Sequence, residues 1–203
     1  MMDQGYCDIQ DDEEEAREET RLIQLHPNIE CRSAKTSPLS RDDWGTPQWF
    51  YDLLFDEFEF ELDACANEKN AKHWNYYSLD ERGEDALLLP WAKRTFDNCP
   101  YSKTAKFLKK AFFEAIHGNL SVHPIAARPG TIYWHELVAD VASEIRFVKG
   151  RLHFDDAKDP APFDSAVVIF DPENLQPVGG PKHVYWDCRP KKEKTSKRKN
   201  KDI

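Results

Sequence analysis

The sequence predicts an α/β fold whose sheet is mostly parallel, with helices packed on both of its faces. Short apolar segments, typical of buried strands, alternate with longer segments whose apolar residues recur at helical spacing. In order they read strand, helix, strand, helix, strand, strand, and such alternation favours a largely parallel sheet. The last two strands follow each other without a helix, which predicts a hairpin-like end to the sheet.

Charge divides the 203 residues into a central domain and two tails. Acidic residues dominate positions 8–19, and lysine and arginine dominate positions 191–201. Blocks of like charge with few apolar residues are typical of disordered tails. We therefore expect an acidic tail over residues 1–40, one domain over residues 41–188, and a basic tail over residues 189–203.

The composition argues against several classes of protein. No apolar stretch approaches the length of a membrane span, and the acidic N-terminus does not resemble a signal peptide, so a cytoplasmic protein is expected. The five cysteines are far apart and form no C-x-x-C pair, and the seven histidines are scattered, so neither a disulfide framework nor a metal site is expected. The net charge of −9 does not by itself indicate a nucleic-acid-binding protein.

The domain begins with a loop that leads into a helix. Thr46 is a suitable N-cap residue, and Pro47 a suitable first helical residue. Helical spacing then predicts a helix that ends near residue 57, and it is carried by Trp49, Phe50, Leu53, Leu54 and Phe58.

Residues 60–66 predict a short buried strand that ends on small residues. Asp63 is followed by Ala64 and Cys65, so a ligand could approach the backbone at the strand's carboxyl end, where open α/β sheets bind ligands. The segment has no G-x-G-x-x-G fingerprint, and a strand ending in a tight turn explains it equally well.

Residues 94–102 carry the pattern with the most chemical content. A strand over residues 94–96 leads to Asn98, and then to Pro100 and Tyr101. The Asn98 side-chain carbonyl and the next backbone carbonyl can both accept hydrogen bonds from one NH2 group, Pro100 stiffens the loop, and Tyr101 offers a face for stacking. A β-turn before a helix is the simpler interpretation of these residues alone.

The remaining segments complete the expected fold. Residues 70–77 are polar and aromatic, and should be irregular, while Asp85 is an isolated acid near a loop. Helices are predicted over residues 103–117, ended by Gly118, and 133–142; strands are predicted over residues 121–127, 144–148, 152–154 and 166–170. From residue 179 the pattern predicts no regular element.

Several motifs, taken in their order along the chain, are similar to those of one family. They are Asp43-Trp44-x-Thr46-Pro47; Leu62-Asp63-x-x-Ala66 with Asn70-Ala71-Lys72; Asp85-x-Leu87-x-x-x-Trp91 before Asn98-x-Pro100-Tyr101-Ser102; and the late stretch Phe147-Val148-Lys149-Gly150-Arg151-Leu152-x-Phe154. In this order and spacing the chain resembles the phage-type DNA N6-adenine methyltransferases, the Dam family, over residues 42–170.

The resemblance implies a class I, Rossmann-like methyltransferase that uses S-adenosylmethionine and methylates N6 of a flipped-out adenine in DNA. By this match Asn98, Cys99, Pro100 and Tyr101 would hold the base, with the carbonyl of residue 99 as the second acceptor. The implied cofactor-binding residues are Trp44, Thr46, Pro47, Asp63, Ala64, Cys65 and Asp85. A phage or prophage origin, with action on DNA in the bacterial cytoplasm, is also implied, for restriction-modification or for regulation.

One residue departs from the family's Asn-Pro-Pro-Tyr motif. Cys99 stands where the first proline is expected, which keeps the backbone carbonyl and loses one fixed φ angle. Phosphate contacts would need cations, and Arg128, Lys149 and Arg151 are candidates because each falls in a predicted loop. The basic tail could add salt-dependent affinity for DNA.

Other functions remain compatible with the sequence. The negative charge and Cys99 suit a non-catalytic relative, such as a DNA mimic or a methyltransferase-like protein that binds DNA or a partner. Methylation of cytosine N4 or of adenine in RNA would use a similar loop. A nuclease is disfavoured, because no acid–acid–lysine set occurs at suitable spacing.

Overall fold

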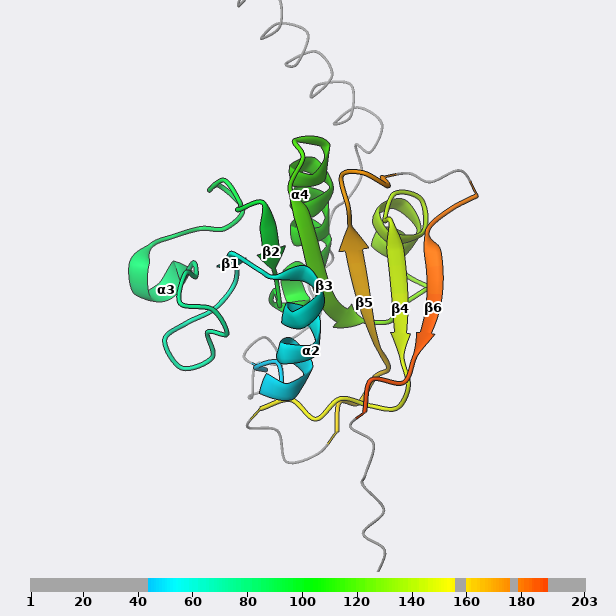
Figure 1. Cartoon of the computed structure of the whole chain (residues 1–203), viewed down its shortest axis with the longest axis horizontal. Helices are drawn as coiled ribbons and strands as arrows, with labels where there is room; N and C mark the ends of the chain where they lie inside the picture. Colours follow the sequence, from blue (N-terminus) through cyan, green and yellow to red (C-terminus); the bar gives the residue numbers. More distant parts are fainter. Residues whose placement is uncertain (1–43, 156–159, 176–178, 190–203) are drawn as a thin grey trace, which may run out of the picture.

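The computed structural model describes residues 44–155, 160–175 and 179–189, and a six-stranded sheet runs through this part (Figure 1). The strands are β1 (Leu62–Asp63), β2 (Arg94–Phe96), β3 (Leu120–Ala126), β4 (Glu144–Val148), β5 (Ser165–Phe170) and β6 (Lys182–Trp186). Their order across the sheet is β1-β2-β3-β5-β4-β6. The predicted tails over residues 1–40 and 189–203 lie outside the described residues, apart from Arg189.

The predicted mostly parallel sheet is confirmed. Neighbouring strands are parallel from β1 to β3, and β6 is parallel to β4. β5 is antiparallel to both β3 and β4, so it alone runs against the other strands of the described sheet. The carboxyl ends of β1, β2, β3, β4 and β6 therefore meet at one edge, and β4 and β5 form the expected hairpin-like pair.

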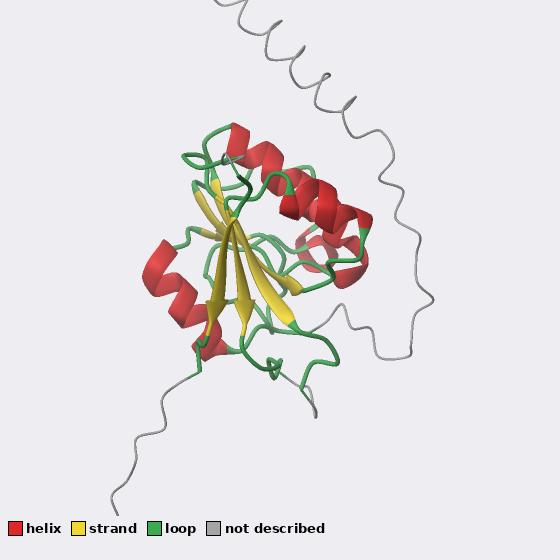
Figure 2. Ribbon diagram, turned by 90° about the vertical axis from the view of Figure 1, so that its right-hand side faces the viewer, coloured by secondary structure: helices red, strands yellow, loops and turns green. Residues whose placement is uncertain are grey.

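Helices cover both faces of the sheet, as Figure 2 shows from the side. α2 (Gln48–Phe58) buries Phe50 and Leu54 against one face, in a cluster with Phe96. α4 (Thr104–Ile116) and the π-helical segment η3 (Trp134–Ala139) cover the other face, where Leu108 and Val138 are fully buried. The predicted α/β class and its two helical layers are thus confirmed. No helix within these residues is both long and apolar enough to cross a membrane.

The beginning of α2 differs from the prediction by one residue. Pro47 is the N-cap residue, and no side chain caps the helix. The Pro47 carbonyl accepts hydrogen bonds from Phe50 N (3.0 Å) and Tyr51 N (3.1 Å), so the first turn begins one residue later than expected. Thr46 is buried instead, and its hydroxyl has no hydrogen-bond partner in the described structure.

Other differences concern short or polar elements. Residues 152–154 do not form the predicted strand, and Asp155 makes only an isolated bridge to Gly45. β6 forms after residue 179, where no element was expected. It is an edge strand with one neighbour, and its polar side chains hide the apolar pattern from which strands are predicted. A short helix, α3 (Leu79–Arg82), was also not predicted. Gly118 follows α4 with a φ of +83° and ends it as expected.

The contact between α4 and the sheet should dominate stability. Leu108 is 0% exposed, so Leu108→Ala should lower the free energy of unfolding by about 2–5 kcal/mol through reduced burial and the cavity it leaves. Leu88 is 81% exposed, and Leu88→Ala should change stability by less than about 0.5 kcal/mol. Urea denaturation of both variants checks this expectation, and equal effects would contradict it.

Candidate active site

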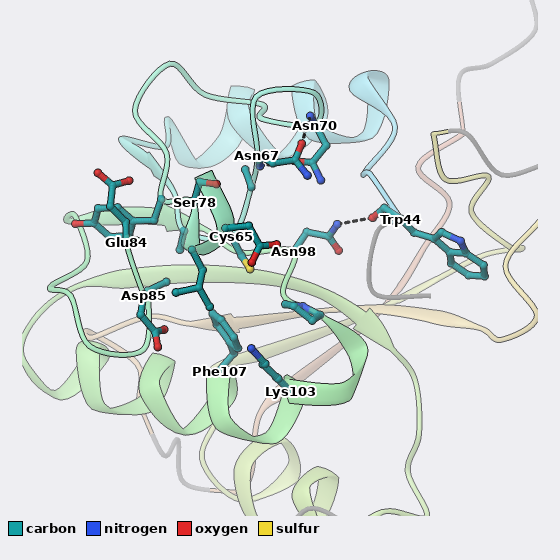
Figure 3. Close-up of a pocket in the computed structure, with 17 residues that line it drawn as sticks. Trp44, Cys65, Asn67, Asn70, Ser78, Glu84, Asp85, Asn98, Lys103 and Phe107 are labelled. Atoms are coloured by element: carbon teal, nitrogen blue, oxygen red, sulfur yellow. Dashed lines mark hydrogen bonds between the residues drawn. The ribbon is translucent and has the colours of Figure 1, made fainter. Parts of the chain in front are cut away.

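A cleft lies at the edge of the sheet where β1 and β2 end, between the loops that follow these strands (Figure 3). Open α/β sheets bind ligands at this edge, because loops diverge there from the carboxyl ends of the strands. The structure brings six sequence-predicted site residues together in the cleft lining: Trp44, Ala64, Cys65, Asp85, Asn98 and Pro100. They come from four segments that are far apart along the chain.

The orientation of the Asn98 amide is fixed by one hydrogen bond. Asn98 Nδ2 donates to the carbonyl oxygen of Trp44 at 2.8 Å, shown as a dashed line in Figure 3. A backbone carbonyl can only accept, so the NH2 group of the amide must face Trp44. Asn98 Oδ1 then points the other way, and it has no hydrogen-bond partner among the described residues. The cleft is thus lined by a side-chain carbonyl that is free to accept.

The loop after Asn98 is compact. Pro100 has a φ of −53° and its carbonyl accepts from Lys103 N at 2.8 Å, which forms the short helix η2 (Tyr101–Lys103) ahead of α4. Cys99 is 4% exposed, and burial raises the pKa of its thiol well above the ordinary value. A buried, protonated thiol is a poor nucleophile, so Cys99 acts as a small apolar residue that fills space here.

The Tyr101 ring lies within an aromatic cluster beside the cleft. Its centroid is 5.0 Å from that of Phe163 and 6.3 Å from those of Trp44 and Phe154, each in an edge-to-face arrangement. Trp44 in turn stacks on Phe154 at 5.5 Å. These contacts join the loop before α2, the loop after β2 and the segment between β4 and β5.

Asp63 lies beneath the cleft instead of lining it. Its side chain is buried, and Oδ2 accepts a hydrogen bond from Lys72 N at 2.9 Å. Burial raises the pKa of Asp63 to about 7, against the opposing effect of hydrogen bonds from the backbone of Lys72 and Cys65. Asp63 Oδ1 has no hydrogen-bond partner in the described structure. The carboxyl group therefore links the end of β1 to the backbone of Cys65 and Lys72.

Three charged residues in the cleft lining were not singled out from the sequence. Asp80 and Glu84 join Asp85 on the acidic side, and Lys103 faces the cleft from the end of η2 (Figure 3 labels all but Asp80). Glu84 Oε2 is buried without a hydrogen bond. A local signal for α3 existed, because Ser78 and Glu81 match the S-x-x-E pattern of a helix start. Ser78 is the N-cap residue, and its Oγ accepts from Glu81 N at 3.4 Å.

Thr46 and Pro47 do not line the cleft, although Trp44 two residues earlier does. Both are tied to the site indirectly. The segment before α2 is held by the Gly45–Asp155 bridge, and Asp155 also pairs with Lys72 at 2.7 Å. Thr46 and Pro47 are buried next to this segment and outside the cleft lining.

The predicted DNA-binding cations lie at the same edge of the sheet as the cleft. Arg128 follows the carboxyl end of β3, and its guanidinium is 5.9 Å from the Phe163 ring centroid. Lys149 and Arg151 follow the carboxyl end of β4. Arg151 is exposed, and Lys149 is 66% exposed although it pairs with Asp187 at 2.9 Å. All three could reach a ligand that spans this edge.

The described residues contain no group of three or more His, Cys, Asp and Glu side chains placed to hold a metal ion. Some buried polar residues of this region contact one another. His123, for example, contacts Asp97 and Ser121 inside the sheet.

A mostly parallel sheet covered on both faces, with an oriented amide in the loop after β2, is consistent with a class I, Rossmann-like methyltransferase. The family model of the DNA N-6-adenine-methyltransferases (Dam) matches residues 33–177. The chain therefore belongs to the Dam family, and it is an adenine-specific DNA methyltransferase. The resemblance seen in the motifs is confirmed.

A relative supports the same family. The DNA N-6-adenine-methyltransferase of Haemophilus phage HP1 (strain HP1c1) is 26% identical over 170 residues, which cover 79% of this chain and 95% of the relative.

The buried position of Cys99 leads to a prediction. Cys99→Pro restores a fixed φ angle in a loop whose other proline is already in place, so the methylation rate should be kept, or raised by up to about fivefold. Steady-state rates of methyl transfer to DNA would measure this. Loss of activity in a variant with unchanged thermal stability would show that the loop needs cysteine at this position.

Proposed function

We propose that this chain transfers a methyl group from S-adenosylmethionine to N6 of an adenine that is flipped out of duplex DNA. The observation that carries the proposal is the Asn98 amide, held by Trp44 so that Oδ1 is free to accept at the cleft. This acceptor faces the cleft at the carboxyl ends of β1 and β2, the edge where open α/β sheets bind ligands, which supports the proposal. The phage origin of the relative supports action in the bacterial cytoplasm.

The lining of the cleft fits the cofactor. S-adenosylmethionine carries a positive sulfonium, an ammonium group and two ribose hydroxyls. Asp80, Glu84 and Asp85 can accept hydrogen bonds from the ammonium and the hydroxyls, and their charge suits the sulfonium. The buried Glu84 Oε2 has Arg82 Nη1 3.9 Å away but no hydrogen bond, which a ribose hydroxyl would supply. Ala64 and Cys65 leave the backbone of their turn accessible, and Asp63 supports this turn from below. We assign Trp44 to the cofactor-binding wall of the cleft, and Thr46 and Pro47 to its support.

The loop after β2 suits an exocyclic amine. Asn98 Oδ1 and the carbonyl of Cys99 would each accept one N6 hydrogen, which orients the nitrogen lone pair toward the cleft. When bound, S-adenosylmethionine supplies an electrophilic methyl group for direct displacement by that nitrogen. The work of Asn98, Cys99 and Pro100 is then positioning and electrostatic stabilisation of the amine.

The proposal includes base flipping, because N6 inside a duplex cannot enter a cleft at a strand end. Unstacking a base costs a few kcal/mol, and aromatic stacking recovers part of that cost. The cluster around Tyr101 offers such aromatic surface next to Asn98. We assign Tyr101 to stacking on the base. We assign Arg128, Lys149 and Arg151, at the same edge of the sheet, to contacts with the DNA backbone.

Asn98→Ala tests the amine-binding step. The variant should lose about 100- to 1000-fold in methyl transfer, because one oriented acceptor is removed from the transition state. Binding of S-adenosylmethionine should weaken by less than about tenfold, because Trp44 loses its hydrogen bond to Asn98 while the acidic lining stays intact. Labelled S-adenosylmethionine, unmethylated duplex and nucleoside analysis give the rate and the product, and calorimetry gives the affinity.

Two outcomes would overturn the assignment. If Asn98→Ala weakened cofactor binding as much as it slowed transfer, Asn98 would be a structural residue. If the unsubstituted chain bound the cofactor and DNA but yielded no N6-methyladenine, the proposed reaction would be wrong.

The cations at the edge generate a separate prediction. Arg151→Gln should weaken binding to duplexes of any sequence, and should reduce the slope of log affinity against log salt by about 1 for each phosphate that the side chain neutralises. Lys109→Gln is the matched control, since Lys109 is an exposed cation on α4. Fluorescence anisotropy at several salt concentrations measures both variants. Equal slopes for Arg151→Gln and the unsubstituted chain would remove Arg151 from the DNA-binding face.

A further inference from the structure

Three charged side chains form a cluster at the carboxyl ends of β4 and β6. Lys149 Nζ is 2.9 Å from Asp187 Oδ2. Arg189 donates to both oxygens of the same carboxylate, from Nε to Oδ1 at 2.9 Å and from Nη2 to Oδ2 at 3.0 Å. The side chains of Lys149, Asp187 and Arg189 are 66%, 44% and 57% exposed. One carboxylate therefore holds two cations at the surface of the protein.

The backbone brings these side chains together. β6 runs parallel beside β4, as Figure 1 shows, and Lys149 N donates to Trp186 O at 2.8 Å. Trp186 and Cys188 pack against the apolar cluster that contains residues of α2. Asp187 and Arg189 alternate with them and are exposed. The register of the two strands thus sets the meeting of Lys149 with Asp187.

The cluster lies at the same edge of the sheet as the cleft, because β4 and β6 run in the direction of β1, β2 and β3. Neighbouring strands lie about 4.8 Å apart, so the three steps from β2 to β4 span about 14 Å. A duplex rises about 3.4 Å per base pair, so a duplex with one base in the cleft could bring phosphates to the cluster about four base pairs away. The chain also enters its basic positions 191–201 just after Arg189.

The carboxylate of Asp187 resembles a phosphate in what it offers to cations. Hydrogen bonds from Arg189, and then from Lys149, hold its pKa well below the usual range, so it is ionised near neutral pH. It presents two oxygens to the guanidinium, in the paired arrangement by which arginine also binds phosphate. Exposed ion pairs add little to stability, so the fold itself gains little from this one.

We propose that the ends of β4 and β6 form a binding surface for the DNA backbone, in which Asp187 occupies Lys149 and Arg189 until phosphates displace it. The two cations then exchange a carboxylate for phosphate oxygens, and the displaced carboxylate opposes binding. Asp187 thereby limits the affinity of the chain for DNA. This inference rests on the proposed function, in which duplex DNA is the substrate at this edge.

A mutant cycle tests whether Asp187 acts through its two cations. Asp187→Asn should tighten binding to duplex DNA by about three- to tenfold at low salt, and should steepen the slope of log affinity against log salt by about 1. In a chain that also carries Lys149→Gln and Arg189→Gln, the same substitution should tighten binding by less than about twofold. Fluorescence anisotropy measures each affinity. Unchanged or weaker binding by Asp187→Asn, or equal gains in both backgrounds, would overturn the proposal.

Glu173→Gln is the matched control, because it makes the same change in charge elsewhere. Glu173 is exposed and follows β5, whose carboxyl end lies at the opposite edge of the sheet. Its substitution should change the affinity for DNA by less than about twofold. A gain equal to that of Asp187→Asn would show that only the net charge matters, and would also overturn the proposal.

Two further measurements separate this inference from loss of fold and from the proposed function. The thermal midpoint of Asp187→Asn should shift by less than about 2 °C, and a larger loss would make Asp187 a structural residue and contradict the proposal. Nucleoside analysis reports methyl transfer independently. If N6-methyladenine forms while the mutant cycle shows no coupling, this inference alone fails; if the coupling appears without N6-methyladenine, the inference stands and the proposed reaction fails.

Discussion

A hydrogen bond between the side chain of Asn98 and the carbonyl of Trp44 connects the two halves of the site across 54 positions of sequence. The loop that enters α2 and the loop that leaves β2 would otherwise be independent. Because the Trp44 carbonyl accepts only, this one hydrogen bond also decides which end of the amide faces the ligand. The aromatic contacts of Trp44 with Phe154 and Phe163 then bring in a third segment, between β4 and β5.

Two buried carboxylates lie next to the site, and a core that served packing alone would not contain them. Asp63 and Asp97 end neighbouring parallel strands, both are buried, and each has an oxygen without a hydrogen bond in the described structure. Such groups cost stability, and they accumulate where a protein must hold a precise geometry or a particular charge. The large apolar clusters on the two faces of the sheet offset this cost.

Local patterns allowed much of the fold to be predicted. The strand over residues 144–148 and the helix around Leu108 were predicted almost to the residue, because apolar periodicity carries their burial. β6 was missed, because an edge strand with one neighbour can keep polar side chains. The contacts that define the site could not be found this way: Asn98 meets Trp44, and Asp97 meets His123, across stretches with no local pattern. Motif order pointed to the catalytic loop, but not to the acids at positions 80 and 84.

The stretch beside β1 has a consequence for solubility. Asp63 N donates to Asn75 O and Tyr77 N donates to Asp63 O, so backbone from residues 75–77 occupies the outer side of a very short strand. An uncovered strand at this position would offer free N–H and C=O groups to other chains, which is a common route to aggregation. The same stretch continues directly into Ser78 and the acidic wall of the cleft. The folding of residues 75–78 therefore both forms the acidic wall of the cleft and covers the edge of the sheet. Loss of this segment's fold should impair catalysis and promote aggregation together.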